Sequence, residues 1–232
     1  MGSKRRIAKY ILPIILKDRK PDQWYVEPFV GGANMIDKVG GNRIGADNNK
    51  YLIALLKHCS EGKSKELSDY ITEEEYNHIK NNKEKYSMVE VAHCGFNSSF
   101  GAKWFGGYTR ARKNGWNRDV ICGKNLLIKQ MNNLAGVHFI NTTYQKLDIP
   151  KNSIIYCDPP YQNTTKYKTG DFNHAEFWQW CREKTTEGHK VFISEYNAPD
   201  DFECIWEKQI SNTLANKSHN KKPVEKLFKL RQ

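Results

Sequence analysis

The sequence of 232 residues lacks several signals that would assign it to common classes of protein. Its six cysteines lie at least 23 residues apart and form no CxxC pair, so no zinc module is visible. The seven histidines form no HExxH motif, which leaves no argument for a catalytic metal. No apolar run approaches the ~18 residues of a membrane helix, and no secretory leader is recognisable. We therefore expect reduced thiols and a cytoplasmic protein without metal or membrane contact.

Acidic residues are scarce relative to basic ones. The 37 Lys and Arg residues outnumber 26 Asp and Glu, which gives a formal net charge of +11 and a pI near 9.3. With 12% aromatic residues, this balance favours a polyanionic partner, nucleic acid first. A basic surface can also serve solubility alone. At 27.0 kDa the chain can bury one good core, and one domain with a large insertion is favoured over two independent domains.

Short apolar segments alternate with helical patterns through much of the chain, which predicts an α/β fold. The expected strands cover residues 24–27, 43–46, 137–141, 153–158, 190–194, 204–209 and 224–230. The expected helices cover residues 4–16, 35–39, 50–58, 123–133 and 174–187. Because a loop joins the last two strands, they predict an antiparallel hairpin at the edge of a seven-stranded sheet.

The segment Ile154–Tyr161, IIYCDPPY, has the pattern of a buried parallel strand that carries a polar tip to the carboxyl edge of a sheet, where open α/β folds bind ligands. Pro159 and Pro160 fix two φ angles and remove two backbone donors, so free carbonyls and the Asp158 carboxylate form a cluster of acceptors. Tyr161 adds a flat aromatic face. A planar group with an exocyclic NH₂, such as adenine, fits this site. A strand followed by a proline-stiffened turn is the alternative.

A glycine turn at Gly31-Gly32 stands between an expected strand and an expected helix. Glycines there let a ligand approach the backbone and leave free N–H groups, as in nucleotide-type cofactor loops, although a simple tight turn is also open. Asp47 and Asn48 follow the next strand, 16 residues after Gly31, where an acid commonly binds ribose hydroxyls. Capping of the following helix is the other role open to them. Tyr144 follows the end of a later strand. It either lines the same pocket or belongs to a simple turn.

Residues 61–135 interrupt the α/β alternation, and their two halves differ in charge. Residues 61–90 hold eight acids and five lysines, and Thr72 begins a capping-box arrangement, which predicts a solvated helical scaffold. Residues 91–135 hold seven Lys or Arg and Asp119 alone, with interleaved aromatics. Between positions 94 and 117 no helical or strand period is sustained, which favours a loop-rich binding surface.

That surface has the residue types that bind nucleic acid: cations for phosphates, aromatics that stack or wedge between bases, and glycines that allow close approach. A hydrophobic mini-core is the alternative role for the same aromatics, and we expect some of them, such as Phe96 and Phe105, to serve packing instead. The candidate contacts are Ser99, Phe100, Lys103, Trp104, Arg110, Arg112, Lys113, Trp116 and Arg118. A basic loop near the C-terminus adds Lys221 and Lys222, for which phosphate contact and plain solvation are both open.

With these residues assembled, the sequence resembles the Dam-type, D12-class DNA adenine N6-methyltransferases, especially short forms from phages and prophages, over nearly the whole chain. Gly2-Ser3-Lys4 resembles the family's Gly-x-Lys motif, Glu27–Gly32 its EPFxGxG loop, and Asp158–Tyr161 its DPPY motif. Asp47 stands where the family has a second-strand acid. Two features depart from the pattern: no Tyr or Trp precedes Gly2-Ser3-Lys4, and the second loop glycine directly follows the first.

The resemblance implies a Rossmann-like α/β methyltransferase sheet, S-adenosylmethionine as cofactor and double-stranded DNA as partner. It implies a catalytic domain of residues 1–57 and 136–232 and a helical, loop-rich target-recognition insertion of residues 58–135. We expect a monomer in the cytoplasm of a bacterial host, host- or phage-encoded. The implied cofactor contacts are Lys4, Pro28, Phe29, Val30, Gly31, Gly32, Asp47, Asn48, Tyr144 and Asp158. The implied catalytic residues are Asp158, Pro159, Pro160 and Tyr161, with Tyr161 stacked on a flipped adenine.

Adenine N6 is a poor nucleophile because its lone pair is delocalised into the ring. We hypothesise that Asp158 and the Pro159 carbonyl accept both N6 hydrogens, which localises the lone pair toward the sulfonium methyl for direct displacement. Methylation of RNA adenine or of cytosine N4 on the same fold stays open, as does a catalytically silent DNA-binding module. GATC is the family's usual target and our expectation for the recognised sequence.

Overall fold

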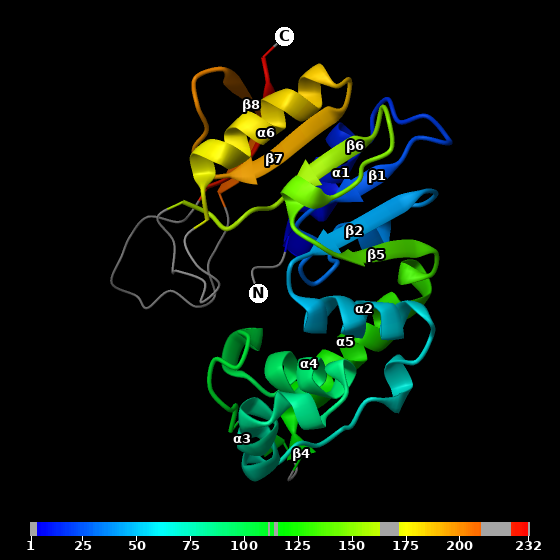
Figure 1. Cartoon of the computed structure of the whole chain (residues 1–232), viewed down its shortest axis with the longest axis vertical. Coiled ribbons are helices and arrows are strands. Elements are labelled where there is room, and N and C mark those ends of the chain that lie inside the picture. Colours follow the sequence, from blue (N-terminus) through cyan, green and yellow to red (C-terminus); the bar gives the residue numbers. More distant parts are fainter. Residues whose placement is uncertain (1–3, 111, 114–115, 163–171, 210–223, 232) are drawn as a thin grey trace.

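The computed structural model describes residues 4–110, 112–113, 116–162, 172–209 and 224–231. Figure 1 shows two parts stacked along the long axis: a twisted sheet flanked by helices, and a group of helices beyond one edge of that sheet. The strands of the sheet are β1 (Tyr25–Glu27), β2 (Arg43–Asp47), β5 (Val137–Asn141), β6 (Ile154–Cys157), β7 (Lys190–Glu195), β8 (Phe202–Gln209) and β9 (Val224–Leu230).

Within the described residues, the strands of this sheet number seven, as expected, and lie in the order β5-β2-β1-β6-β7-β9-β8. The first five pair in parallel, and β9 runs antiparallel to both β7 and β8, so the expected final hairpin is confirmed as well. The chain builds outward from β1 through β2 to β5, then returns to begin β6 on the other side of β1. The carboxyl ends of β1 and β6 therefore flank the switch point at which open α/β sheets bind ligands.

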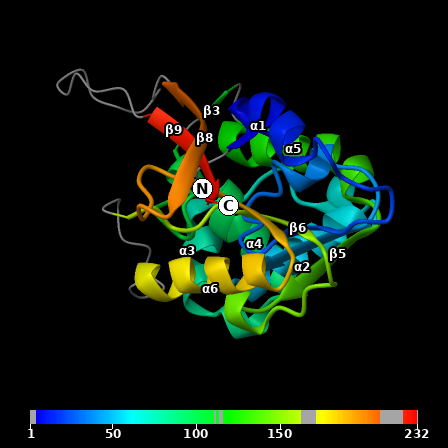
Figure 2. The same cartoon turned by 90° about the horizontal axis from the view of Figure 1, so that it is seen from above.

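Both faces of the sheet are covered, because successive side chains of each central strand point to opposite sides. Tyr25, Ile154 and Tyr156 pack with helix α1 (Ala8–Ile15) on one face. Val26, Ile155 and Cys157 pack with helix α6 (His174–Thr186) on the other. Figure 2 shows α1 and α6 on opposite sides of the strands. This double covering explains why β1 and β6 are buried at every position.

The remaining helical elements are η1 (Lys4–Arg6), η2 (Ile36–Lys38), α2 (Lys50–Ser60), η3 (Ser64–Glu66), α3 (Glu73–Asn81), η4 (Lys83–Lys85), α4 (Met88–Asn97), η5 (Phe100–Ala102), α5 (Arg118–Leu134) and η6 (Tyr144–Lys146). A two-stranded hairpin, β3 (Arg112–Lys113) and β4 (Trp116–Asn117), precedes α5. No helix within the described ranges is long and apolar enough to cross a membrane.

Several elements differ from the sequence-based expectation. The helix expected over residues 4–16 is a 3₁₀ turn followed by α1, and the one expected over 35–39 is the single 3₁₀ turn η2. Helix α5 begins at Arg118 and not at residue 123. Gly123 lies inside the helix, packed so closely against α4 that a Cβ there would stand 2.4 Å from Cγ of Asn97. Helix α4 extends into the stretch expected to be loop. Its Gly95 lies against Trp104, where a Cβ would stand 2.6 Å from the ring.

The helices beyond the sheet have a small core of their own. It contains Ile71, Tyr76, Ile79, Val91, Cys94, Phe105 and Val120. The packing roles expected for Phe96 and Phe105 are confirmed, since their exposed fractions are 4% and 6%. The capping box that begins at Thr72 is also present, with Thr72 Oγ1 and the Glu75 carboxylate exchanging hydrogen bonds with each other's backbone N–H.

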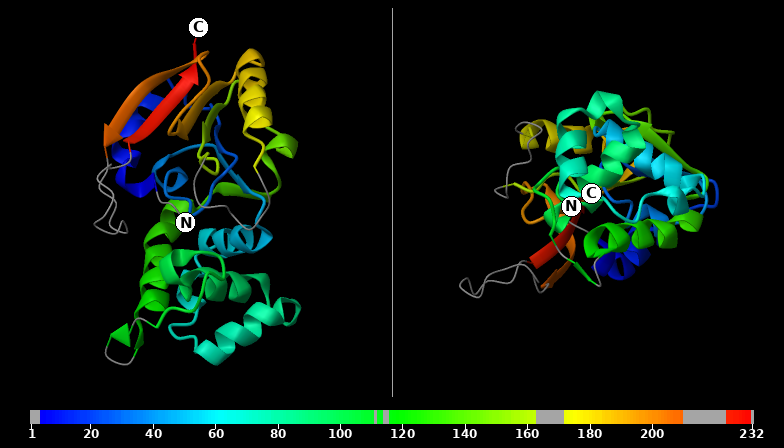
Figure 3. Two further views of the ribbon diagram at one scale, coloured as in Figure 1. Left: turned by 90° about the vertical axis from the view of Figure 1, so that its left-hand side faces the viewer. Right: turned by 90° about the horizontal axis from the view of Figure 1, so that it is seen from below.

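Helix α5 connects the two parts of the molecule. It follows the β3–β4 hairpin and runs back to the sheet (Figure 3). At the sheet end, the Arg43 guanidinium donates to the carbonyl oxygens of Asn133 at 2.6 Å and Ala135 at 2.7 Å. Charge-assisted bonds from a buried side chain on β2 therefore hold the end of α5.

Candidate active site

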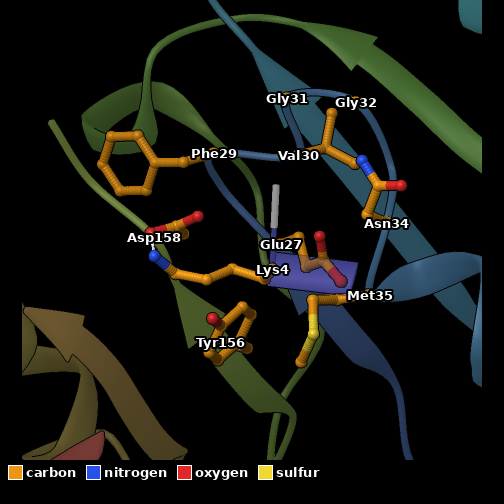
Figure 4. Close-up of a pocket in the computed structure, with 10 residues that line it drawn as sticks. All are labelled: Lys4, Glu27, Phe29, Val30, Gly31, Gly32, Asn34, Met35, Tyr156 and Asp158. Atoms are coloured by element: carbon orange, nitrogen blue, oxygen red, sulfur yellow. Dashed lines mark ion pairs between the residues drawn. The ribbon is translucent and has the colours of Figure 1, made fainter. Parts of the chain in front are cut away.

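A small pocket opens at the carboxyl edge of β1 and β6 (Figure 4). Its lining residues are Lys4, Glu27, Phe29, Val30, Gly31, Gly32, Asn34, Met35, Tyr156 and Asp158. Six of these, Lys4, Phe29, Val30, Gly31, Gly32 and Asp158, were expected from the sequence as cofactor contacts. The structure thus brings the glycine loop, the N-terminal lysine and the acid after β6 to one place. No group of three or more His, Cys, Asp or Glu residues in the described ranges could hold a metal ion.

The glycine loop is a tight turn between β1 and η2. Val30 N–H donates to the Ala46 carbonyl at 2.8 Å, and Ala33 N–H donates to the Val30 carbonyl at 2.9 Å. Gly31 has φ +48°, the left-handed region that favours glycine, while a Cβ on it would meet no atom within 4 Å. The conformation of the turn, and not crowding, therefore explains the glycine at this position.

Asp47 ties this loop to β2 instead of lining the pocket. Its Oδ2 accepts a hydrogen bond from Gly31 N–H at 3.3 Å, and its Oδ1 accepts one from Asn49 N–H at 2.9 Å. Burial raises the pKa of Asp47, and these two backbone donors oppose the shift. The N-cap of α2 is Asn49, whose Oδ1 accepts from Tyr51 and Leu52, so the capping role considered for Asp47 or Asn48 belongs to the next residue. Asn48 is exposed.

Glu27 is a site residue that sequence reasoning missed. It ends β1, lines the pocket and is 3% exposed, and its buried Oε1 has no hydrogen-bond partner among the described residues. Burial raises the pKa of this carboxyl well above its ordinary value, and the nearby Tyr25 hydroxyl, which itself lacks a partner of good hydrogen-bond geometry, opposes the shift. A buried acceptor without a partner is costly unless a ligand satisfies it. The available signal was its position: the residue directly before Pro28, at the end of a buried strand.

An ionic cluster forms around Lys4 at the other side of the pocket. Lys4 Nζ lies 3.2 Å from Asp158 Oδ1 and 3.1 Å from Glu225 Oε2, and it also hydrogen-bonds to the hydroxyl of Tyr161. Burial raises the pKa of Asp158, and the nearby ammonium opposes that shift. For Lys4, burial alone would lower the pKa, but the two carboxylates raise it, and the net shift is upward. Lys4 therefore stays charged and stabilises the carboxylate form of Asp158.

The segment after β6 is held by two further acids that sequence reasoning also missed. Tyr161 donates its hydroxyl hydrogen to Glu225 Oε2 at 2.8 Å, and its ring meets that of Tyr196 edge-on, with centroids 4.6 Å apart. Gln162 N–H donates to Glu195 Oε1 at 2.6 Å. Glu195 ends β7 and Glu225 lies on β9, and no local motif marks either of them. Pro159 is buried and Pro160 half-buried.

Besides Asp47, three expected cofactor residues stand behind the pocket or outside it. Tyr144 is 6% exposed, and its ring packs 5.3 Å from that of Phe29, which lines the pocket. Pro28 is buried and, like Asn48, is absent from the lining. Tyr144 therefore supports the pocket wall through Phe29.

The expected nucleic-acid contacts separate into exposed and buried residues. Phe100 is 66% exposed, and Lys103, Arg110 and Arg118 are also exposed. Arg110 already pairs with an acid on α3, with Nη2 2.6 Å from Glu73 Oε1. The side chains of Arg112, Lys113 and Trp116, and the whole of Lys221 and Lys222, lie outside what the structure describes.

Ser99 and Trp104 do not lie where a nucleic-acid contact was expected. Ser99 is 2% exposed, and its Oγ donates to the Gly95 carbonyl at 2.8 Å. The same Oγ lies 3.0 Å from the hydroxyl oxygen of Tyr76. Trp104 packs against Phe96 and Tyr51, with ring centroids 4.7 and 5.2 Å away. Both residues therefore serve the packing of the helical part, because their polar or aromatic groups already have partners there.

Comparison with known proteins identifies the family of this chain. A family model for D12 class N6 adenine-specific DNA methyltransferase matches residues 1–103 and 91–226. The chain belongs to this family. The match confirms the resemblance stated from the motifs, and with the strand order it makes the sheet the Rossmann-like methyltransferase fold.

Two other comparisons say less about this D12-class chain. No curated protein matches its sequence. Among solved structures, the crystal structure of SMU.472, a proposed methyltransferase complexed with SAH, is similar over 99% of this chain and 53% of that chain, with 13% identity and a TM-score of 0.35. The D12-class chain thus spans about half the length of SMU.472, and a likeness this distant carries no argument about the site.

Proposed function

We propose that this D12-class chain transfers a methyl group from S-adenosylmethionine to N6 of adenine in duplex DNA. The observation that supports it most is that the glycine loop and Asp158 line one pocket at the switch point of the sheet. In this arrangement the glycine loop would hold the methyl donor, and Asp158 would hold the base that accepts the methyl group, at the same edge of the sheet.

The residues around the glycine loop fit S-adenosylmethionine. Glu27 offers a buried acceptor without a partner to a cationic group, and the cofactor carries an ammonium and a sulfonium. Phe29 and Met35 add apolar surface beside it. When bound, the cofactor supplies an electrophilic methyl group on sulfur.

Asp158 and the Pro159 carbonyl act on the base. In the proposed reaction they would accept hydrogen bonds from the two N–H groups of adenine N6, which directs the lone pair of N6 out of the ring plane, and the one proton that N6 loses on methylation would leave along one of these hydrogen bonds. Lys4 favours the carboxylate form of Asp158 that this role requires. Since N6 is hydrogen-bonded inside a duplex, the base must be flipped out to reach this corner, and Tyr161 stacks on it there.

DNA is held, in this proposal, by a target-recognition insertion of residues 58–135. Phe100, Lys103, Arg110 and Arg118 present exposed side chains on it, which suit stacking and phosphate neutralisation. GATC stays the expected target. The proposal places a monomeric enzyme in the cytoplasm of a bacterial host, encoded by the host or by a phage.

The direct test compares the wild type with Asp158→Ala and with the exposed control Asp148→Ala. We expect Asp158→Ala to abolish methyl incorporation into duplex DNA while DNA binding is largely kept, because the acceptor for N6 is removed but the insertion is untouched. Asp148→Ala should match the wild type. Methyl incorporation is followed by nucleoside analysis.

Three outcomes would contradict the proposal. An active Asp158→Ala protein rules out the mechanism. Methyl incorporation into RNA alone, or recovery of N4-methylcytosine, assigns another substrate. Absence of S-adenosylmethionine binding by calorimetry points to a silent DNA-binding module.

A further inference from the structure

Two buried carboxylates from the strands beyond β6 hold the DPPY segment, and neither belongs to a motif of the sequence. Glu195 holds the backbone of Gln162, and Glu225 holds the side chain of Tyr161. We propose that Glu225 is a positioning residue for methyl transfer, which fixes the ring of Tyr161 by its hydroxyl and shares Lys4 with Asp158. The inference rests on the proposed function of this pocket.

The first part of the argument is the anchoring of Tyr161. One atom, Glu225 Oε2, receives both the Tyr161 hydroxyl at 2.8 Å and the Lys4 ammonium at 3.1 Å. The side chains of Glu225 and Lys4 are only 9% and 11% exposed, so water competes little for these bonds. Charge-assisted bonds in such a setting are stronger than neutral ones. Because the ring of Tyr161 also packs in a T-shaped contact with that of Tyr196, it is oriented before a base arrives.

The second part concerns the charge on Asp158. Without Glu225, the Lys4 ammonium would have Asp158 as its only carboxylate partner among the described residues. A lysine paired fully with Asp158 competes with the N6 hydrogens for the same carboxylate. Because Glu225 shares Lys4, Asp158 stays ionised and accepts the hydrogen bond from N6–H more readily than it would if it were fully paired with Lys4.

This sharing has a consequence for the pH dependence of the reaction. The groups that act on Asp158 are Lys4, Glu225 and Tyr161. The charge of Asp158 also acts on the other titratable groups around it, Glu27, Tyr156, Cys157, Glu195 and Tyr196. Burial is the main cause of its raised pKa, Lys4 opposes it, and the negative charge of Glu225 adds to it. Replacing Glu225 by a neutral side chain therefore lowers the pKa of Asp158, and the acid limb of the kcat profile moves to lower pH.

The test measures kcat and KM against pH for the wild type, Glu225→Gln, Tyr161→Phe and the double variant. The matched control is Glu203→Gln, which removes a carboxylate of the same hairpin that pairs with Lys229 at 3.0 Å, away from the pocket lining. We expect Glu225→Gln to lower kcat by about 10- to 100-fold, the range for a misplaced reacting group, with KM values within about twofold. The double variant should be no slower than the slower single variant, because both changes remove the same charge-assisted hydrogen bond: Gln keeps only a neutral acceptor, and Phe has no hydroxyl to donate.

The outcomes separate this inference from the proposed function. A wild type that transfers no methyl group overturns the proposed function. If the wild type is active and Glu225→Gln has the same kcat and the same acid limb in its pH profile, the positioning role is overturned. It is also overturned if the fold-losses in kcat of the two single variants multiply in the double variant. If Glu225→Gln fails to fold, judged by circular dichroism, Tyr161→Phe decides alone, and an unchanged kcat overturns the inference. The Glu203→Gln control should match the wild type throughout.

Discussion

At the scale of one residue, Glu27 carries a cost in stability at the lining of the pocket. Its carboxyl is buried with an unpartnered oxygen, a state that a folded protein tolerates when a ligand completes it. Its pKa in the folded protein lies above that in the unfolded chain, mainly because of burial. The folded state therefore binds this proton more tightly, and stability falls as pH rises from the unfolded pKa toward the folded one.

We predict that Glu27→Gln raises the melting temperature at neutral pH, because it removes the buried ionisable group. The same change should weaken S-adenosylmethionine binding, because it removes the anion that a ligand cation would contact. The gain in melting temperature should shrink as the pH falls toward the ordinary pKa of glutamate. Thermal unfolding at several pH values and calorimetry of cofactor binding measure the two effects. Glu74→Gln, exposed on α3, is the control. A variant that binds the cofactor as tightly as the wild type would exclude Glu27 from the site.

At the scale of elements, α5 joins the helical part to the glycine loop. It has 17 residues and so spans about 25 Å. Near its sheet end, Gln130 Nε2 donates to the carbonyl oxygen of Gly32 at 3.3 Å and to Asp37 Oδ2 at 3.1 Å, and Gln130 is 5% exposed. At its other end, Asp119 Oδ2 accepts the hydroxyl hydrogen of Thr109 at 2.5 Å. One rigid element therefore contacts both the expected DNA-binding surface and the glycine loop.

We predict that Gln130→Met, which removes the donor but keeps a similar volume, weakens S-adenosylmethionine binding by about 5- to 10-fold, as expected when buried acceptors lose a partner. Duplex DNA binding in the absence of cofactor should stay unchanged, because the insertion surface is not altered. Calorimetry with cofactor and fluorescence anisotropy with a labelled duplex give the two affinities. Gln179→Met, exposed on α6, is the control. Unchanged cofactor affinity would show that α5 does not support the loop.

At the scale of the whole molecule, the net charge of +11 decides little until its distribution is known. Cations lie on the helical part, where Lys103, Arg110 and Arg118 are exposed, and also at the amino edge of the sheet, where Lys151 and Lys190 are exposed. Only the first group stands on the proposed insertion. The cations at the amino edge of the sheet therefore supply an internal control for general electrostatic attraction.

We predict that replacing Lys103, Arg110 and Arg118 by Gln weakens duplex binding and flattens its salt dependence. The slope of log K against log salt should become shallower by about 0.9 for each phosphate that the protein no longer neutralises. The same three-charge change at the amino edge, Lys20, Lys151 and Lys190 to Gln, should leave the slope near the wild-type value. Binding isotherms at several salt concentrations measure both. Equal slopes in the two triple variants would refute the assigned surface.

The sequence by itself determined the features that depend on neighbouring residues. Hydrophobic runs placed the strands, Thr72 and its following acids placed a helix start, and the short motifs around Gly31 and Asp158 named the family. Such signals are local, because a period, a cap or a motif is written in consecutive positions. The same locality misled where a glycine or an aromatic served packing, as at Gly123 and Trp104.

Only the tertiary structure decided which distant residues meet. Glu225 reaches Tyr161 because β9 inserts between β7 and β8, an order that no local pattern states. Asp47 proved to hold Gly31, and Glu27 proved to be buried without a partner, because strand pairing sets these contacts. Long-range contacts follow from how whole elements pack, so the partners of a catalytic side chain become visible only once the sheet is assembled.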